Sequence, residues 1–594
     1  MSSTRKTSPG GDAGGAVLLI LVLAGLGLYA AVWGVMSLSH QLDGTGADVP
    51  VNPIEFVAAL TAGSLAWAPS ALMLGIAATV LVAVVVIDGA FLIGRARGKR
   101  SRVDVAARHM GRGRDVEGLT KQNAVAIAKR LGVDAAPGVV VGKSVATGAT
   151  LYGSWEDLHV VIAGPRTGKT TSLVTPAVVE APGAVVTTSN KRDVVDATRD
   201  VRAKRGQVWV FDPQGVAEEP ATWWWDPLSY VTDDEKARTL ATHFATGSRD
   251  ASAKTDAYFD GAGLVLLAGL LLAAAVDRRP ITDVYRWLTR PTDETAADVL
   301  RERYPVISDQ LLGAMQSPEK QRGGIYGTAQ QMAACLTNSR ILPWVTPPEG
   351  ADKWTRQAFD PHAFVQHTDT VYALSKEGAG NAGLLVTALT VAVIEAAEDL
   401  AKRSPNGRLV TPMLGVLDEA ANVCRWRDLP SLYSHYGSRG IILMTVLQSW
   451  SQGVDVWTES GMKKLWSAAN IATYLGGVKE TGFLEDLSKL VGSYDRVTSS
   501  VTSGQRTSVS RSLQRDRILD VDELSALPRG RAVVLASGSR ATLVRSLPWM
   551  AGQHADAIRA SIQAHDPHSA STLEDAYVSL ASMQAADREQ QEAA

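Results

Sequence analysis

The sequence predicts an α/β fold, in which an all-α insertion interrupts a parallel, helix-covered sheet and two transmembrane helices precede it. Three observations predict this. Short apolar runs alternate with helical patterns at 159–211 and again from 370 onward. The stretch between them, about 233–349, has helical patterns only. Two long uncharged runs lie near the N-terminus.

Composition sets the first limits. The 594 residues are enough for several domains of roughly 100–200 residues each. Hydrophobic residues make up 46% and charged residues 20%, which is typical of a globular protein with some membrane segments. The net charge of −2 excludes a polyanion binder that is basic over its whole surface, but it leaves room for a local basic patch. The two cysteines, Cys335 and Cys424, are too few for a zinc site or a disulfide framework, which fits a reducing cytoplasm.

The first uncharged run, residues 16–38, would span roughly 34 Å as a helix, enough for a bilayer core of about 30 Å. The second run, 66–87, ends before Asp88. Because backbone groups in lipid must be satisfied internally, each run predicts a transmembrane helix. A cleaved signal peptide is the alternative for the first run. Its length, the lack of a clear cleavage site and the second run argue against that alternative.

The placement of lysine and arginine predicts the orientation. Arg5 and Lys6 precede the first run, the connecting loop has no basic residue, and eight basic residues follow the second run between 95 and 114. By the positive-inside rule this is a two-pass protein with both termini in the cytoplasm. The basic stretch also suits anionic membrane lipids, although stopping transfer is a sufficient role for it.

The strongest chemical signal is the stretch HVVIAGPRTGKTT at 159–171, which predicts a buried strand, a glycine-bearing loop and a helix start. Residues 163–170 have the spacing of a Walker A loop, which turns its N–H groups toward phosphates. We expect ATP here, with Lys169 on the β- and γ-phosphates and the Thr170 hydroxyl on Mg²⁺. The alternative is a tight strand–helix turn with an exposed lysine. The candidate nucleotide-binding residues are Ala163, Gly164, Pro165, Arg166, Thr167, Gly168, Lys169, Thr170 and Thr171.

A partner motif follows a second apolar strand pattern at 413–417, which ends in Asp418 and Glu419. Ligands bind at the carboxyl ends of strands in open α/β sheets, so these carboxylates are expected at the site. Asp418 is the candidate Mg²⁺ ligand and Glu419 the candidate general base that polarises the attacking water. An Asp-Glu pair after a strand is a weak signal alone, because solvated strand ends often look like this, but it is strong beside a Walker A loop.

Two further residues are catalytic candidates. Gln448 ends the apolar run 441–447, where an amide can sense the γ-phosphate or orient the water; the alternative is a polar strand cap. Arg439, in the preceding GSRG segment, is a candidate arginine finger across a subunit boundary; the alternative is a surface arginine.

Lys169 and Asp418 lie 249 positions apart, more than a simple nucleotide-binding core needs between its two motifs. The surplus predicts an inserted all-helical domain. The serine- and threonine-rich stretch 498–512 predicts a flexible loop, with DNA contact as the weaker interpretation. The predicted domains are a membrane anchor at 1–95, two parts of a P-loop ATPase domain at 96–232 and 350–560, the insertion at 233–349, and an acidic, flexible tail at 561–594.

Together these features resemble the type IV coupling proteins of the TraG/TraD kind. The likeness runs through nearly the whole chain in order: two N-terminal spans, then AGPRTGKTT, VFDPQG ending at 215, WDPL at 225–228, LDEAAN at 417–422, GSRGIILMTVLQSWSQ at 437–452, LSKLVGSY and LDVDELSALPRGRAVVL. Two features depart from the family pattern. Ala163 and a bulky Arg166 make the phosphate loop a variant form, and Asp226 stands where asparagine is expected.

The resemblance implies a RecA-like ATPase that assembles as a homo-hexamer at the inner membrane. It also implies partners, namely a relaxase or relaxosome with single-stranded DNA, and the components of a type IV secretion channel. ATP turnover would power or gate transfer.

Three alternatives stay open. A receptor for protein effectors would use the same scaffold without handling DNA. A double-stranded DNA pump of the FtsK kind usually has more spans and a C-terminal DNA-reading domain, and no obvious basic reading helix is found here. A scaffold with a degenerate site is disfavoured, because Lys169, Thr170, Asp418 and Glu419 are all present.

Overall fold

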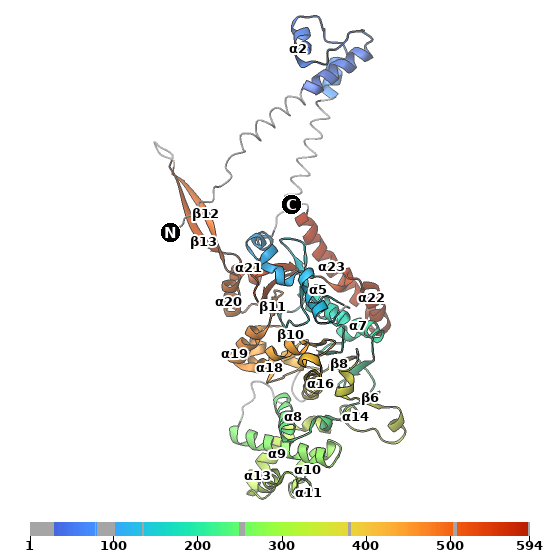
Figure 1. Ribbon diagram of the computed structural model, residues 1–594, viewed down its shortest axis with the longest axis vertical. Coiled ribbons are helices and arrows are strands. Elements are labelled where there is room, and N and C mark those ends of the chain that lie inside the picture. Colours follow the sequence, from blue (N-terminus) through green and yellow to red (C-terminus); the bar gives the residue numbers. More distant parts are fainter. Residues whose placement is uncertain are drawn as a thin grey trace. The chain divides into compact units, whose positions relative to one another are not determined.

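The computed structural model of the chain describes residues 29–77, 79, 101–133, 136–248, 256–377, 382–502 and 508–591. The chain forms two compact units. The smaller comprises Met1–Arg100 with Ala586–Ala594, and the larger comprises Ser101–Ala585. The larger unit holds the sheet and the main helical segments (Figure 1).

The smaller unit contains helical segments at 29–42 and 71–77, with α2 (Pro53–Thr61) between them. It has a small core of its own, made of Met36, Val49, Phe56, Leu65, Ala68 and Ala71.

The two predicted membrane helices are not supported by the described residues. Positions 16–28, 78 and 80–87 of the predicted spans lie outside them. The second span was also predicted to begin too early, because residues 66–70 are not helical. Pro69 lies in this segment, and the carboxylate of Asp43 accepts hydrogen bonds from the backbone N–H and the hydroxyl of Ser70 at 2.8 and 2.9 Å. The spans therefore remain a prediction.

Among the described residues, one helix is long and apolar enough to cross a membrane. This is α9 (Ala257–Val276), which lies in the helical segment of the larger unit and is half buried there. Its buried residues include Leu267, Leu270 and Leu271, which are part of the main hydrophobic core.

The larger unit is built on an eleven-stranded sheet in the order β2-β1-β15-β14-β11-β3-β10-β9-β4-β8-β5. All neighbours from β11 to β5 are parallel. The remaining pairs are antiparallel. The strands are β1 (Val139–Ser144), β2 (Thr150–Gly153), β3 (His159–Ile162), β4 (Val185–Ser189), β5 (Val208–Phe211), β8 (Thr370–Leu374), β9 (Met413–Leu417), β10 (Ile441–Leu447), β11 (Ile471–Tyr474), β14 (Arg531–Ala536) and β15 (Thr542–Arg545), with a separate short pair, β6 (Trp223–Trp224) and β7 (Gln357–Ala358).

The parallel part confirms the predicted α/β sheet, whereas strands β1, β2 and β15 of the antiparallel edge were not predicted. Its strand β1 contains Gly142, at a register shift opposite β2. A Cβ at Gly142 would lie 2.8 Å from the carbonyl oxygen of Arg545 on β15. A glycine that permits close strand approach interrupts the apolar pattern by which a strand is recognised.

Helices cover the sheet, and α8 to α13 form a helical segment, whereas α14 packs beside β6 (Figure 1). The long α16 lies in the core, with residues 383–394 all buried. Besides α9, the helices are α4 (Arg102–Ala106), α5 (Lys121–Arg130), α6 (Thr175–Glu180), α7 (Asp193–Ala203), α8 (Asp234–Gly247), α10 (Thr282–Leu288), α11 (Thr295–Leu300), α12 (Pro305–Met315), α13 (Glu319–Met332), α14 (Leu342–Val345), α15 (Pro361–Phe364), α16 (Gly383–Arg403), α17 (Ala420–Val423), α18 (Leu429–Tyr436), α19 (Trp450–Ala468), α20 (Thr481–Val491), α21 (Val521–Ser525), α22 (Ala555–His565) and α23 (Ser569–Gln591).

The prediction of a flexible loop at 498–512 is wrong over residues 498–502 and 508–512, and its remaining residues, 503–507, lie outside the described part of the chain. The chain there forms a hairpin of β12 (Ser493–Thr502) and β13 (Ser508–Arg517), paired in continuous antiparallel register from Ser493↔Arg517 to Thr502↔Ser508. Alternating threonine, serine and valine suits a strand as well as a loop, so composition alone could not decide between them.

The flexible tail predicted at 561–594 is also wrong over its described part. Residue 561 lies inside α22, and α23 follows. Leu573, Ala576, Tyr577 and Leu580 of α23 pack on a core shared by α22 and α7. These apolar positions have helical spacing, which the acidic composition of the segment concealed.

Arg202 on α7 connects the amino ends of β4 and β8 through hydrogen bonds. Its substitution tests the fold. Its side chain is fully buried, and the guanidinium donates to the carbonyls of Ala181, Gly183 and Thr368 and to the Thr370 hydroxyl at 2.7–2.9 Å. Burial lowers the pKa of this arginine to about 10. Arg202→Ala should lower the free energy of unfolding by about 3 kcal/mol, because it removes four hydrogen bonds and leaves the carbonyls of Gly183 and Thr368 without this donor. Thermal unfolding checks this, with the exposed Lys204→Ala as control. Equal midpoints for both variants would contradict it.

Candidate nucleotide site

The predicted phosphate loop follows β3 and connects it to a helix. After Ile162 the chain runs through 163–169, enters a helical turn at Thr170–Val174 and continues as α6. The Ala163 N–H donates to the Leu447 carbonyl and the Gly164 N–H to the Gly476 carbonyl, both at 2.9 Å. The start of the loop is therefore held between the ends of β10 and β11.

Close backbone approach explains the glycine at position 164. A Cβ on Gly164 would lie 2.2 Å from the carbonyl oxygen of Gly477, which is closer than any real side chain permits. Inside the loop, the Thr167 hydroxyl donates to the Gly164 carbonyl at 2.8 Å and the Thr171 hydroxyl to the Gly168 carbonyl at 3.1 Å.

Two loop residues adopt left-handed backbone conformations, Gly168 with φ 88° and Arg166 with φ 60°. Glycine adopts this conformation without strain, whereas a residue with a side chain costs roughly 1–2 kcal/mol. Arg166 and the neighbouring Pro165 are exposed at the tip of the loop.

Lys169 meets the two predicted carboxylates. Its Nζ lies 3.3 Å from Oδ1 of Asp418 and hydrogen-bonds to Oε1 of Glu419. The side chains are 14%, 4% and 5% exposed for Lys169, Asp418 and Glu419, so the ion pairs are shielded from water. Shielding strengthens the attraction but adds a desolvation cost, which the mutual contacts of the three groups offset.

Neighbouring residues hold the backbone of Asp418 and the carboxylate of Glu419 in place. The Thr188 hydroxyl at the end of β4 donates to the Asp418 carbonyl at 3.0 Å. The Gln448 amide at the end of β10 donates to Oε2 of Glu419 at 2.7 Å. Glu419 itself has φ 54°, a left-handed conformation that is costly for glutamate. Strain of this kind persists where the surrounding structure enforces it, and it is frequent at functional sites.

The electrostatics follow from one lysine facing two buried acids. Burial raises the pKa of Asp418 to about 6; Asp193 and Glu419 add to the rise, and Lys169 opposes it. For Lys169, burial favours the neutral amine, but attraction and hydrogen bonds from both carboxylates outweigh this and raise its pKa. The site therefore has an excess of negative charge that a cation can compensate.

The side chains of this site can bind a divalent cation only together with a bound ligand that supplies further oxygen atoms. Among the described residues, no group of three or more His, Cys, Asp or Glu side chains could hold a metal. Oδ1 of Asp418 is nevertheless buried and has no hydrogen-bond partner beyond its ion pair. One carboxylate, one hydroxyl such as that of Thr170 and the oxygens of a bound phosphate form the set that Mg²⁺ prefers.

Arg439 is not brought to this site. It precedes β10 and so lies at the opposite edge of the sheet from Gln448, which follows β10. Its guanidinium lies 2.9 Å from Nε2 of His435 and 3.6 Å from Oε1 of Glu398. A role across a subunit boundary stays a prediction.

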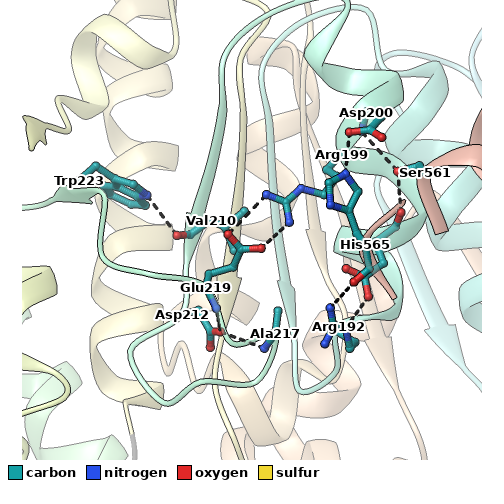
Figure 2. Close-up of polar contacts among 11 residues, drawn as sticks. Arg192, Arg199, Asp200, Val210, Asp212, Ala217, Glu219, Trp223, Ser561 and His565 are labelled. Atoms are coloured by element: carbon teal, nitrogen blue, oxygen red, sulfur yellow. Dashed lines mark hydrogen bonds and ion pairs between the residues drawn. The ribbon is translucent and has the colours of Figure 1, made fainter. Parts of the chain in front are cut away.

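The adjoining VFDPQG segment forms a tightly bonded loop after β5 (Figure 2). The carboxylate of Asp212 accepts from the backbone N–H groups of Ala217 and Glu219 at 2.9 and 3.2 Å. It also accepts from the N–H of Val216 at 2.6 Å. The Glu219 side chain then pairs with Arg199 on α7. The described residues thus give Asp212 a structural role at the carboxyl edge of the sheet.

Sequence reasoning missed three contributors to the site: the Gly476-Gly477 pair, Thr188, and Met583 on α23. The Gly-Gly pair directly after a strand pattern was a usable signal for close backbone approach. Thr188 and Met583 carry no local signal, because their roles depend on strand order and helix docking.

Comparison with known proteins identifies a related domain. Residues 412–529 match the family model described as the TraM recognition site of TraD and TraG. This segment contains Asp418, Glu419 and Gln448. No curated protein matches the chain.

Solved structures of one protein are similar to the chain. The unbound bacterial conjugative coupling protein TrwB has a TM-score of 0.51 at 16% identity, over 71% of this chain and 91% of that one. TrwB with the GTP analogue GDPNP has a TM-score of 0.49 at 16% identity, over 71% and 92%. TrwB with the ATP analogue ADPNP has 0.48 at 15%, over 66% and 86%.

The match to unbound TrwB supports the predicted fold, an α/β sheet domain that carries a helical segment. The family model places the second half of the candidate site in a TraD/TraG domain. Together they confirm the resemblance of this chain to the type IV coupling proteins of the TraG/TraD kind.

Proposed function

We propose that the chain is a coupling ATPase of a conjugation or type IV secretion system, which binds ATP and Mg²⁺ beside β3, β9 and β10. The observation that carries this proposal is the convergence of Lys169, Asp418, Glu419 and Gln448 at one edge of the sheet. Such a set holds a phosphate chain, a cation and an attacking water together.

Each residue has a role that follows from its contacts. Lys169, which pairs with the carboxylates in this structure, turns to the β- and γ-phosphates when nucleotide binds. Glu419 is then free to accept a proton from water, and Gln448 holds the carboxylate in the required direction. Thr170 and Asp418 would hold Mg²⁺, and the bound ion would neutralise charge on the phosphate oxygens.

The cargo and partners of the ATPase follow from its relatives. We infer that the chain recruits a relaxase bound to single-stranded DNA to a secretion channel, and that the segment 412–529 contacts a relaxosome protein. The description of the matching domain as a TraM recognition site supports this. The assembly is a homo-hexamer, anchored in the inner membrane by two N-terminal spans with both termini cytoplasmic. The two uncharged runs and the basic residues beside them support this anchor.

Two substitutions test the enzymatic role. Lys169→Ala should abolish nucleotide binding and hydrolysis, because it removes the cation that holds the phosphates. Glu419→Gln should lower kcat about 100-fold or more while ATP still binds, because the amide cannot act as a base. Both are measured by ATP hydrolysis and by DNA transfer between cells, with Lys204→Ala as an exposed control. Transfer at the wild-type rate by Lys169→Ala would refute the coupling role.

The pKa of Asp418 predicts a pH dependence. With this pKa raised to about 6, the carboxyl group is mostly ionised at pH 7.5 and about one quarter ionised at pH 5.5. Mg²⁺ binds the ionised form, so the affinity for Mg²⁺-nucleotide should fall about fourfold as the pH drops through this range. Asp418→Asn, measured at both pH values, corrects for titration of the nucleotide itself. The same pH dependence in wild type and variant would show that Asp418 is not the titrating ligand.

A further inference from the structure

The two C-terminal helices are docked on the ATPase domain beside the nucleotide site. Trp549, Met550, Ile558 and Ile562 share a hydrophobic core with Val179, Ala197 and Val201 of α6 and α7. The α7 helix starts four residues after β4 ends, so this core lies close to the carboxyl edge of the sheet.

Polar contacts reinforce the docking of α22 on α7 (Figure 2). The Ser561 hydroxyl donates to the Asp196 carbonyl at 2.6 Å, and Nε2 of His565 lies 2.9 Å from Oδ1 of Asp200. Arg192 donates to the His565 carbonyl at 2.6 Å. Because these contacts join residues more than 360 positions apart, they fix the C-terminal segment on this face.

The next helix, α23, continues from this anchor toward the phosphate loop. Arg559 on α22 donates two hydrogen bonds to the Tyr577 hydroxyl, at 2.9 and 2.6 Å. The apolar stripe of α23 runs through Leu573, Ala576, Tyr577 and Leu580. One helical step further along the same stripe is Met583.

Met583 is 6% exposed and lies between Gly168 of the phosphate loop and Gly530. A Cβ on Gly168 would lie 3.5 Å from Cε of Met583, and a Cβ on Gly530 would lie 3.0 Å from its Cγ. Gly168 directly precedes Lys169, and Gly530 directly precedes β14. The Met583 side chain thus packs between the turn of the phosphate loop and the start of β14.

This contact opposes nucleotide binding, because it holds the loop in the arrangement in which Lys169 pairs with Asp418 and Glu419 instead of with phosphate. Helix docking and nucleotide binding are therefore coupled, and each weakens the other.

We propose that α23 is an autoinhibitory strap, which holds the phosphate loop through Met583 and slows ATP turnover until it lifts. The inference rests on the proposed ATPase function and adds a regulatory element to the same site. A partner that binds α23, or the nucleotide itself, would release the strap.

The test is Met583→Asp in the full-length protein, which places a charge in the buried contact. We expect its basal kcat to rise roughly three- to tenfold, a change of about 1 kcal/mol in barrier, and its KM for ATP to fall. The matched control is Val578→Asp, because Val578 is on the same helix and 63% exposed. It should behave like wild type. Met583→Leu, which keeps an apolar contact, should also stay close to wild type.

A second measurement does not depend on activity. Hydrogen exchange of the amides at 164–172, without nucleotide, should be faster in Met583→Asp than in Val578→Asp. Tyr577→Phe, which removes the acceptor for Arg559, should shift both exchange and kcat in the same direction by less. This milder variant keeps the test informative if Met583→Asp does not fold.

The outcomes separate the two proposals. Hydrolysis by wild type with equal rates and equal loop exchange in Met583→Asp and Val578→Asp would overturn the strap and leave the ATPase intact. Absence of hydrolysis in wild type and Met583→Asp alike would overturn the proposed ATPase function itself.

Discussion

The pairing of Lys169 with Asp418 and Glu419 is the contact on which the architecture of the site depends. It joins residues 249 positions apart, and it requires β9 and β10 to lie between β3 and β4 in the sheet. The same strand order brings Gln448 to Glu419 and Thr188 to Asp418. The helical segment between the two halves of the domain can therefore be long without disturbing the site, because the sheet alone sets the distances.

Close backbone approach is the second constraint. Gly164 and Gly477 lie too near each other for any side chain at 164, and Glu419 has a left-handed backbone. Both features are conformationally costly, and a surface loop without close neighbours would relax out of them. The buried strands on either side enforce them, so the loop and the acidic pair are held in position before any nucleotide arrives.

Much of the fold could be predicted from the sequence because its central strands are short apolar runs that end at a glycine, an acid or an amide. Those ends are also where Lys169, Asp418, Glu419 and Gln448 gather. Strand β1 of the antiparallel edge was missed because Gly142 interrupts its apolar run. The docking of α23 was missed because acidic residues conceal its stripe, and the contact of Met583 with Gly168 depends on tertiary packing that no local pattern records.

The most direct test of the central claim is ATP hydrolysis by the purified full-length protein without DNA, with single-stranded DNA and with duplex DNA. The salt concentration must be fixed, because phosphate contacts make binding salt-dependent. The Lys169→Ala variant gives the blank. A coupling ATPase predicts stimulation by single-stranded DNA that the variant lacks. Stronger stimulation by duplex DNA would indicate a pump of the FtsK kind, and hydrolysis that ignores DNA would indicate a receptor for protein cargo; either result would contradict the account.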